Sequence, residues 1–315
     1  MPIYSKPYLS LPDQLAKLKS RGLKVTDDDE AIQCLHRNGY YRLSAYWYLF
    51  RQINLGERSD KFLDDSYFNH ARDLYVFDKR IKLLLLDAIE RIEIAVRVEI
   101  SLQLGKIDPF AYTNPRLFHT AFTTLDRRTG RIKHREWLIK FDAMVARSRD
   151  EFVLHHKRKY GDTSPLPIWI AIELWDFGML SHLFSGMKVK DRELVSSRFM
   201  VPDWQLMESW LRCLNYVRNV IAHHGRLWNL SLADNPKLPT MGLMPEFDML
   251  LTIPNVNTRL YSICCILSHL SRVINPSSTW TKQLVALVVQ FPAMPHANIH
   301  HMGFPANWQG TDFWK

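Results

Sequence analysis

The chain has 315 residues, of which 47% are hydrophobic, so it can bury a substantial core as one enlarged domain or two. Its 41 lysines and arginines exceed its 32 acidic residues, and the net charge of +9 with a pI near 9.3 favours an anionic partner. No stretch approaches the roughly 18 uninterrupted apolar residues of a membrane span, and residues 1–12 lack the apolar run of a secretory signal. Membrane-spanning and secreted proteins are therefore excluded, and we expect a cytoplasmic protein.

Helices are predicted along most of the chain. The first starts at Thr26, with Asp29 three residues on, and stops at the Asn-Gly pair of residues 38–39. The longest covers residues 71–104, where no glycine or proline interrupts an apolar pattern with steps of three and four residues. Further helices are predicted over residues 135–160, 168–185, 191–199, 203–224, 258–274 and 279–289.

The remaining segments read as loops, at residues 54–60, 118–133 and 231–253. No alternating pattern is long enough to build a sheet, and no internal repeat is visible, so the prediction is an all-α fold. It has an N-terminal helical region over residues 1–70, a helical domain over residues 71–290 and an irregular tail over residues 291–315. The aromatic residues of the tail predict that it docks onto the helical body or onto a second subunit.

An aromatic segment, NGYYRLSAYWYLF, covers residues 38–50. Leu43, Trp47 and Phe50 lie at helical spacing, which favours packing in the core. The alternative is that the aromatic rings of this segment stack on nucleic-acid bases. The four cysteines include an adjacent pair and show no metal-ligand spacing, which favours a reduced compartment. They are Cys34, Cys213, Cys264 and Cys265.

The most informative stretch is residues 214–229, LNYVRNVIAHHGRLWN. At about 100° per residue, a helix here gathers its polar side chains on one line, opposite an apolar line that faces the core. The apolar line holds Trp210, Leu214, Val217 and Ile221. The polar line holds Arg212, Asn215, Asn219, His223 and Arg226, with Arg218 on its flank.

The polar line suits the cleavage or binding of a phosphodiester. Histidine can act as base and as acid near neutral pH, and an arginine fork can hold phosphate oxygens and stabilise charge that develops on them. An ordinary solvated helix face is the alternative.

The run RNVIAHHGRLWN, residues 218–229, resembles the RNxxxHHxRLWN signature of the Abi family of bacterial abortive-infection proteins, of the AbiD/AbiF type. Its Arg-x4-His core resembles the catalytic motif of the HEPN superfamily of ribonucleases. Other segments resemble the same family in the expected order, namely residues 4–7, 11–18, 38–50, 74–97 and 167–183. The resemblance covers about residues 1–240 and implies a HEPN-like helical bundle for residues 71–290.

The resemblance implies an endoribonuclease that acts in abortive infection and uses no metal. Arg218 would bind the scissile phosphate, His223 would assist removal of the 2′-OH proton, and Asn219 would fix their geometry. The products would carry a 2′,3′-cyclic phosphate and a 5′-OH, and DNA would be spared. His224 and Arg226 would have supporting roles, as a second proton-transfer group and a backbone contact.

One Arg-x4-His motif supplies a single base and a single cation. HEPN nucleases pair two such motifs across a dimer, so the resemblance implies a symmetric homodimer in which Arg218 and His223 of both subunits line one cleft. The alternative function is a catalytically inactive HEPN module that binds RNA or protein. A membrane-acting effector of phage defence is disfavoured, because no spanning or strongly amphipathic terminal segment is present.

Outside the motif, Glu93 and Arg97 are four residues apart, as in a helix-surface salt bridge. A second interpretation is that they lie beneath the catalytic helix and orient Arg218 or His223. Two basic clusters are candidate RNA-backbone contacts, with solvated cations as the alternative. They comprise Arg127, Arg128 and Arg131 in one cluster and Lys157, Arg158 and Lys159 in the other.

Metal and cofactor chemistry is not supported by the motifs. The adjacent pairs of histidines diverge by about 100° on a helix, whereas zinc-binding helices space their ligands by four residues. Neither a cluster of carboxylates nor a glycine-rich phosphate loop is present. We therefore expect no metal and no cofactor.

Overall fold

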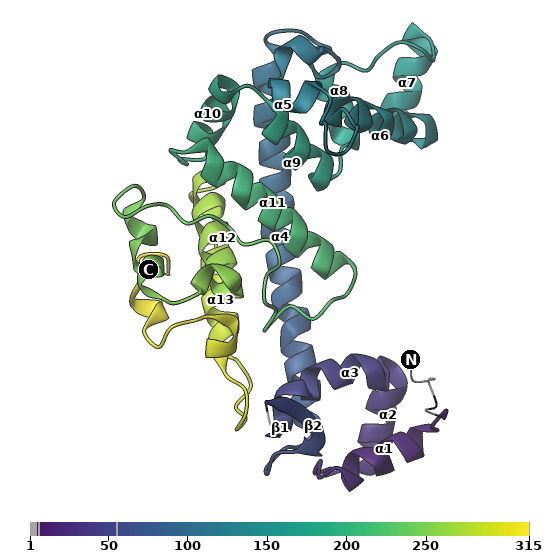
Figure 1. Cartoon of the computed structure of the whole chain (residues 1–315), viewed down its shortest axis with the longest axis vertical. Coiled ribbons are helices and arrows are strands. Elements are labelled where there is room, and N and C mark those ends of the chain that lie inside the picture. The colour runs from purple at the N-terminus through teal and green to yellow at the C-terminus, as the bar shows by residue number, and fades with distance from the viewer. Residues whose placement is uncertain (1–4, 6, 55, 315) are drawn as a thin grey trace.

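The computed structural model describes residue 5, residues 7–54 and residues 56–314. Part of the opening segment of residues 4–7 lies outside the described residues. The fold is mainly helical, as predicted, and is organised around α4 (Phe68–Gly105), which runs along the molecule as a central spine (Figure 1). With 38 residues, this helix is about 57 Å long at 1.5 Å per residue.

The apolar stripe of α4 explains its central position. Its buried side chains recur at steps of three and four residues, from Ala71 through Leu74, Ile81 and Leu85 to Leu104. The first helices of the chain contact α4 near its start, and several helices that follow it in the chain pack along its length. Most of this stripe is fully buried, so the predicted long helix over residues 71–104 is confirmed.

The N-terminal helices pack at one end of α4 (Figure 1). They are α1 (Leu11–Ser20), α2 (Asp28–Asn38) and α3 (Tyr40–Trp47), followed by the 3-10 turn Tyr48–Phe50. The side chain of Asp27, one residue after the predicted Thr26, caps α2 by accepting the Glu30 N–H. Leu43, Trp47 and Phe50 are buried, so the prediction that they form core is confirmed, while Tyr41 is exposed.

Residues 51–54 and 57–62 form a small antiparallel hairpin. The predictions of a loop at residues 54–60 and of no sheet are wrong here. Strand β1 (Arg51–Asn54) pairs with β2 (Glu57–Phe62), and Gly56 in the turn has a φ of +85°, which favours glycine. Both strands are largely polar and their side chains are mostly half-buried or exposed. Because no alternating apolar face is needed, the sequence pattern does not reveal these strands.

Two predicted helices are each divided in the structure. The segment 135–160 forms α6 (Lys133–Arg147) and α7 (Glu151–Tyr160). They are separated where the Ser148 hydroxyl donates to the Asp150 carboxylate and accepts the Asp150 N–H. The segment 168–185 forms α8 (Ile168–Ala171), the 3-10 turn Ile172–Leu174 and α9 (Phe177–Gly186). Asp176 causes the second break, because its carboxylate caps the start of α9 by accepting the Met179 N–H at 2.8 Å.

The other helices that follow α4 are the short α5 (Thr120–Thr123), α10 (Val189–Arg198), α11 (Trp204–Ala222), α12 (Leu260–Ile274) and α13 (Trp280–Val289). Of these, α10 to α13 pack on α4, whereas α5 contacts α6 and α9. The remaining 3-10 turns are Ala111–Thr113, Pro115–Leu117, Pro245–Thr252, Val256–Thr258, Ile299–Met302 and Trp308–Gly310. No helix within the described ranges is both long and apolar enough to cross a membrane.

The tail docks on α12, one of the two predicted alternatives. Trp314 donates its indole N–H to the Tyr261 hydroxyl at 3.3 Å, and Ser268 donates to the Phe313 carbonyl at 3.3 Å. Phe304, Phe313 and several neighbouring side chains are buried. The tail is therefore part of the packed body, although its backbone is mostly irregular.

The four cysteines are all buried and unpaired.

Candidate active site

The motif helix α11 is held by its apolar face. Asp203 caps its start by accepting the Gln205 N–H at 2.7 Å. Trp210, Leu214 and Val217 are fully buried, and the helix packs on α4, α9 and α10. Asn215, Arg218 and Asn219 lie at the edge of this packed face, where they border α9 and face α6 (Lys133–Arg147).

A cleft of about 650 Å³ opens between α11, α9 and α6. It is lined by both polar and apolar side chains, and its charged groups include more cations than anions. From α11 come Asn215, Arg218 and Asn219; from α9 and the residue before it come Asp176, Gly178, Met179, His182 and Ser185; and from α6 come Lys133, Glu136, Trp137 and Lys140, with Phe122 of α5 alongside. The structure thus brings Arg218 and Asn219, two of the three predicted catalytic residues, into one cleft.

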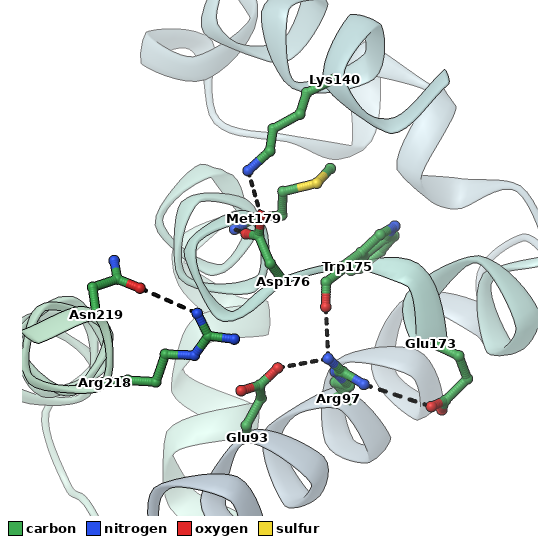
Figure 2. A network of polar contacts seen from close by, with 9 residues as sticks. All are labelled: Glu93, Arg97, Lys140, Glu173, Trp175, Asp176, Met179, Arg218 and Asn219. Carbon is green, nitrogen blue, oxygen red and sulfur yellow. Dashed lines mark hydrogen bonds and ion pairs between the residues drawn. The ribbon is translucent and has the colours of Figure 1, made fainter. Parts of the chain in front are cut away.

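The Arg218 guanidinium points from α11 toward Glu93 and Asp176 (Figure 2). Its Nη1 donates to Asn219 Oδ1 at 3.3 Å. Burial raises the pKa of Glu93, and the positive charges of Arg97 and Arg218 oppose that rise. Arg218 is thus a half-buried cation that is oriented by an amide on one side and by carboxylates on the other.

Glu93 and Arg97 lie on α4 beneath this position, and Arg97 joins two elements. Its guanidinium contacts Glu93 at 2.5 Å, donates to the Trp175 carbonyl at 2.6 Å and lies 3.6 Å from Glu173 (Figure 2). It therefore ties α4 to the segment that leads into α9. Glu93 is close enough to Arg218 for that positive charge to affect its pKa, but neither Glu93 nor Arg97 is among the described residues that line the cleft. That the pair orients Arg218 or His223 stays a prediction.

Asp176 and Lys140 close the cleft on the side opposite Arg218. Lys140 Nζ lies 2.6 Å from Asp176 Oδ2. Burial favours the neutral carboxyl of Asp176, but the hydrogen bond from Lys140, the Met179 N–H and the charge of Arg218 outweigh it and lower its pKa. Asp176 is consequently ionised and is engaged by protein donors.

The motif helix ends earlier than predicted. It stops at Ala222, His223 is its C-cap, and His224 has the left-handed φ of +58°. The His224 and Gly225 N–H groups return to the Ile221 and Val220 carbonyls at 3.0 and 2.8 Å, which closes the helix end. A Cβ on residue 225 would lie 2.9 Å from the Val220 side chain, so only glycine fits there.

This early end separates the polar residues that a longer helix would align. His223 is exposed one turn beyond Asn219 and is not among the described residues that line the cleft. His224 is exposed beside α3, and its carbonyl accepts from Arg42 at 2.9 Å. Arg226 donates to the Ala45 carbonyl instead of extending the polar line, and the prediction that it shares one helix face with Asn219 is wrong.

The last four residues of the motif, Arg226 to Asn229, lead away from the cleft along α4. The fully buried Asp78 accepts the Leu227 and Trp228 N–H groups at 3.1 and 2.7 Å and the Tyr46 hydroxyl at 2.7 Å. Lys82 lies 3.1 Å from Asp78 and donates to the Gly225 carbonyl at 3.0 Å. A buried carboxylate thus fixes where α11 ends.

Residues 33–229, which extend from α2 to the end of this anchored turn, match the family model of Abi-like protein. The chain belongs to the Abi-like protein family. No curated protein and no solved structure matches the chain. The family match contains the cleft and the Asp78 anchor, whereas α12, α13 and the docked tail of this Abi-like protein follow it in the chain.

We expect that replacing Asp78 by alanine lowers the free energy of unfolding of this Abi-like protein by about 3–5 kcal/mol, because it leaves buried donors and a buried cation without their partner. Urea unfolding followed by circular dichroism measures the change. Asp87→Ala is the matched control, because Asp87 is on the same helix in an exposed pair with Arg91. Equal stability of the Asp78→Ala and Asp87→Ala proteins would show that Asp78 is not an anchor.

The two basic clusters differ in how far their cations are available. Arg127 and Arg128 are exposed on the loop before α6, and Arg131 lies 3.2 Å from Glu136, which lines the cleft. On α7, Lys157 donates to the Val145 carbonyl at 2.9 Å, so this cation holds α7 against α6.

The other two cations of the α7 cluster also have partners. Arg158 pairs with Glu151, and Lys159 lies over the ring of Tyr160. The loop cluster is therefore the better placed of the two to reach a ligand in the cleft.

Sequence reasoning did not identify Lys140, Asp176 or His182, although the last two lie in the 167–183 segment that carries the family resemblance.

Proposed function

We propose that this Abi-like protein is a metal-independent endoribonuclease of the HEPN type, of the AbiD/AbiF kind, that acts in bacterial abortive infection as a defence protein or toxin. The observation that carries the proposal is the position of Arg218 and Asn219 in an open cleft that also holds Lys133 and Lys140. Such cations attract the phosphates of a nucleic acid. An arginine fork can also stabilise the charge of a phosphorane-like transition state.

In this reaction, Arg218 binds the non-bridging oxygens of the scissile phosphate and Asn219 holds the guanidinium. The 2′-oxygen attacks phosphorus, the bond from phosphorus to the 5′-oxygen breaks, and His223 takes part in proton transfer. The products carry a 2′,3′-cyclic phosphate and a 5′-OH. The carboxylates at the cleft already contact cations, Asp176 with Lys140 and Glu136 with Arg131, which supports a mechanism based on cations and imidazoles.

The same proposal includes a symmetric homodimer. His223 is exposed at the end of α11, one turn from Asn219 and outside its own cleft. A second copy related by a two-fold axis would bring His223 of the partner subunit to a cleft that already contains Arg218. Both subunits then supply groups to each site.

The test is incubation of the purified protein with labelled single-stranded RNA and with DNA of the same sequence, both in EDTA. We expect cleavage of RNA, intact DNA, and 2′,3′-cyclic phosphate ends that mass spectrometry identifies. Cleavage that EDTA abolishes and magnesium restores would contradict the metal-independent mechanism.

A binding module without catalysis is the second candidate. One observation favours it: Arg218 faces the carboxylates Glu93 and Asp176, which could hold it in a purely structural role. The same incubation separates the two functions. A catalytically inactive module would retain RNA in a gel-shift assay and leave it uncut.

A further inference from the structure

His182 is a histidine of the cleft that the Arg-x4-His motif does not include. It lies on α9, lines the cleft together with Arg218 and Asn219, and is accessible to solvent. Neither of its ring nitrogens forms a hydrogen bond with any other residue that the structure describes. His269, by contrast, has both ring nitrogens bonded, to Glu246 at 2.5 Å and to the Phe199 carbonyl at 3.0 Å. His182 therefore has free proton-transfer capacity, whereas His269 is a structural histidine.

The surroundings of His182 favour its neutral form. The protein atoms around the ring lower its pKa below the usual 6.5, the positive charge of Lys140 lowers it further, and Lys133 adds a smaller effect. Asp176 opposes these effects. The other charged groups that line the cleft are Glu136 on α6 and Arg218 on α11. A neutral imidazole next to cations is suited to accept a proton at neutral pH.

We propose that His182 is the general base of the proposed ribonuclease and that His223 is the general acid. This inference rests on the proposed function. His182 takes the proton of the 2′-OH, the 2′-oxygen forms a bond to phosphorus, and the bond from phosphorus to the 5′-oxygen breaks. The leaving 5′-oxygen takes a proton from the His223 imidazolium. Exchange of protons with solvent then restores both rings.

The division of roles follows from where the two histidines lie. His182 shares a cleft with Arg218, which holds the phosphate next to the attacking 2′-OH. His223 is outside that cleft within one chain, so it reaches the leaving group only when the partner subunit contributes it. The motif alone supplies one histidine to the reaction. His182 on α9 supplies the second proton-transfer group that the proposed mechanism needs.

The experiment compares His182→Gln and His182→Asn with the parent protein on labelled single-stranded RNA in EDTA. Each variant is expected to lower kcat about 100-fold, within the range for loss of a general base. Binding of a fully 2′-O-methylated RNA of the same sequence, which cannot be cleaved, is expected to change less than about threefold. His36→Gln is the matched control, because His36 is exposed on α2 at the other end of the molecule.

The pH profile of kcat separates a base from a structural residue. A base is active when deprotonated, so the activity of the parent is expected to fall on the acid side, below pH 6.5, and this limb is expected to disappear in His182→Gln. Circular dichroism establishes that the variants are folded. Parent-like kcat and pH profile in both folded variants, with Arg218→Ala inactive, would overturn the role of His182 alone. Failure of the parent to cut any RNA would overturn the proposed function and this inference with it.

Discussion

Replacing Arg218 by alanine is expected to lower RNA cleavage by about 100- to 1,000-fold, the range found when one preorganised donor to a transition-state oxyanion is removed. The reason is geometric as well as electrostatic. Asn219 accepts a hydrogen bond from the guanidinium, and the negative charges of Glu93 and Asp176 attract it, so a cation placed elsewhere in the cleft does not substitute for it without movement. Single-turnover cleavage of labelled RNA measures the effect.

Arg218→Lys tests the fork itself. A lysine keeps the charge but lacks the planar pair of donors, so we expect activity nearer to that of Arg218→Ala than to that of the parent. Arg91→Ala is the control, because Arg91 is an exposed arginine on α4 in a surface pair with Asp87. Strong expression of the parent and of Arg91→Ala is expected to slow bacterial growth, whereas Arg218→Ala relieves it. An Arg218→Ala protein that is folded and fully active would exclude Arg218 from the site.

The fold was predictable where local pattern and tertiary packing agree. The stripe of α4 continues over many turns without glycine or proline, so its period alone identifies it. The breaks at Ser148 and Asp176 were not predictable, because short polar side chains end these helices by bonding to nearby groups, while the apolar period continues across them. The hairpin was missed for a related reason, since backbone pairing and Gly56 form it without an apolar face.

The candidate site shows a similar division between what is local and what is not. Arg218 and Asn219 could be identified because they lie in one short motif with recognisable chemistry. Asp78 and His182 could not, because their positions depend on residues far away in sequence: Asp78 accepts the N–H groups of Leu227 and Trp228, and His182 lines the cleft near Lys133 and Lys140 of α6. Sequence spacing does not reveal such contacts.

The motif therefore has two physical parts. Arg218 and Asn219 line the cleft and are the residues to which we assign the proposed chemistry. The segment from Gly225 to Trp228 anchors the end of α11 to Lys82 and Asp78 on α4. His223 lies at the junction of the two parts. Because the anchor fixes the end of the helix, His223 is placed at the surface, where only another molecule or a large movement brings it to a phosphate held by Arg218.

Replacing His223 by alanine is expected to reduce cleavage by about 100-fold or more, because it removes a proton-transfer group, and mixing is expected to restore activity. In a dimer of Arg218→Ala and His223→Ala subunits, the cleft of the His223→Ala subunit keeps Arg218 and receives His223 of the partner subunit. If subunits associate at random, half of the dimers are mixed and each has one intact site, so about a quarter of the parental activity returns.

A site contained in one chain makes the opposite prediction. Both clefts of every mixed dimer would then lack one group, and activity would stay at the level of the single variants. Light scattering of the parent at the assay concentration provides the independent measurement, because the shared site requires a dimer there. Fully active monomers would rule out a shared site. So would a mixture that, after subunit exchange, is no more active than its two components. His223 would then act in the cleft of its own subunit.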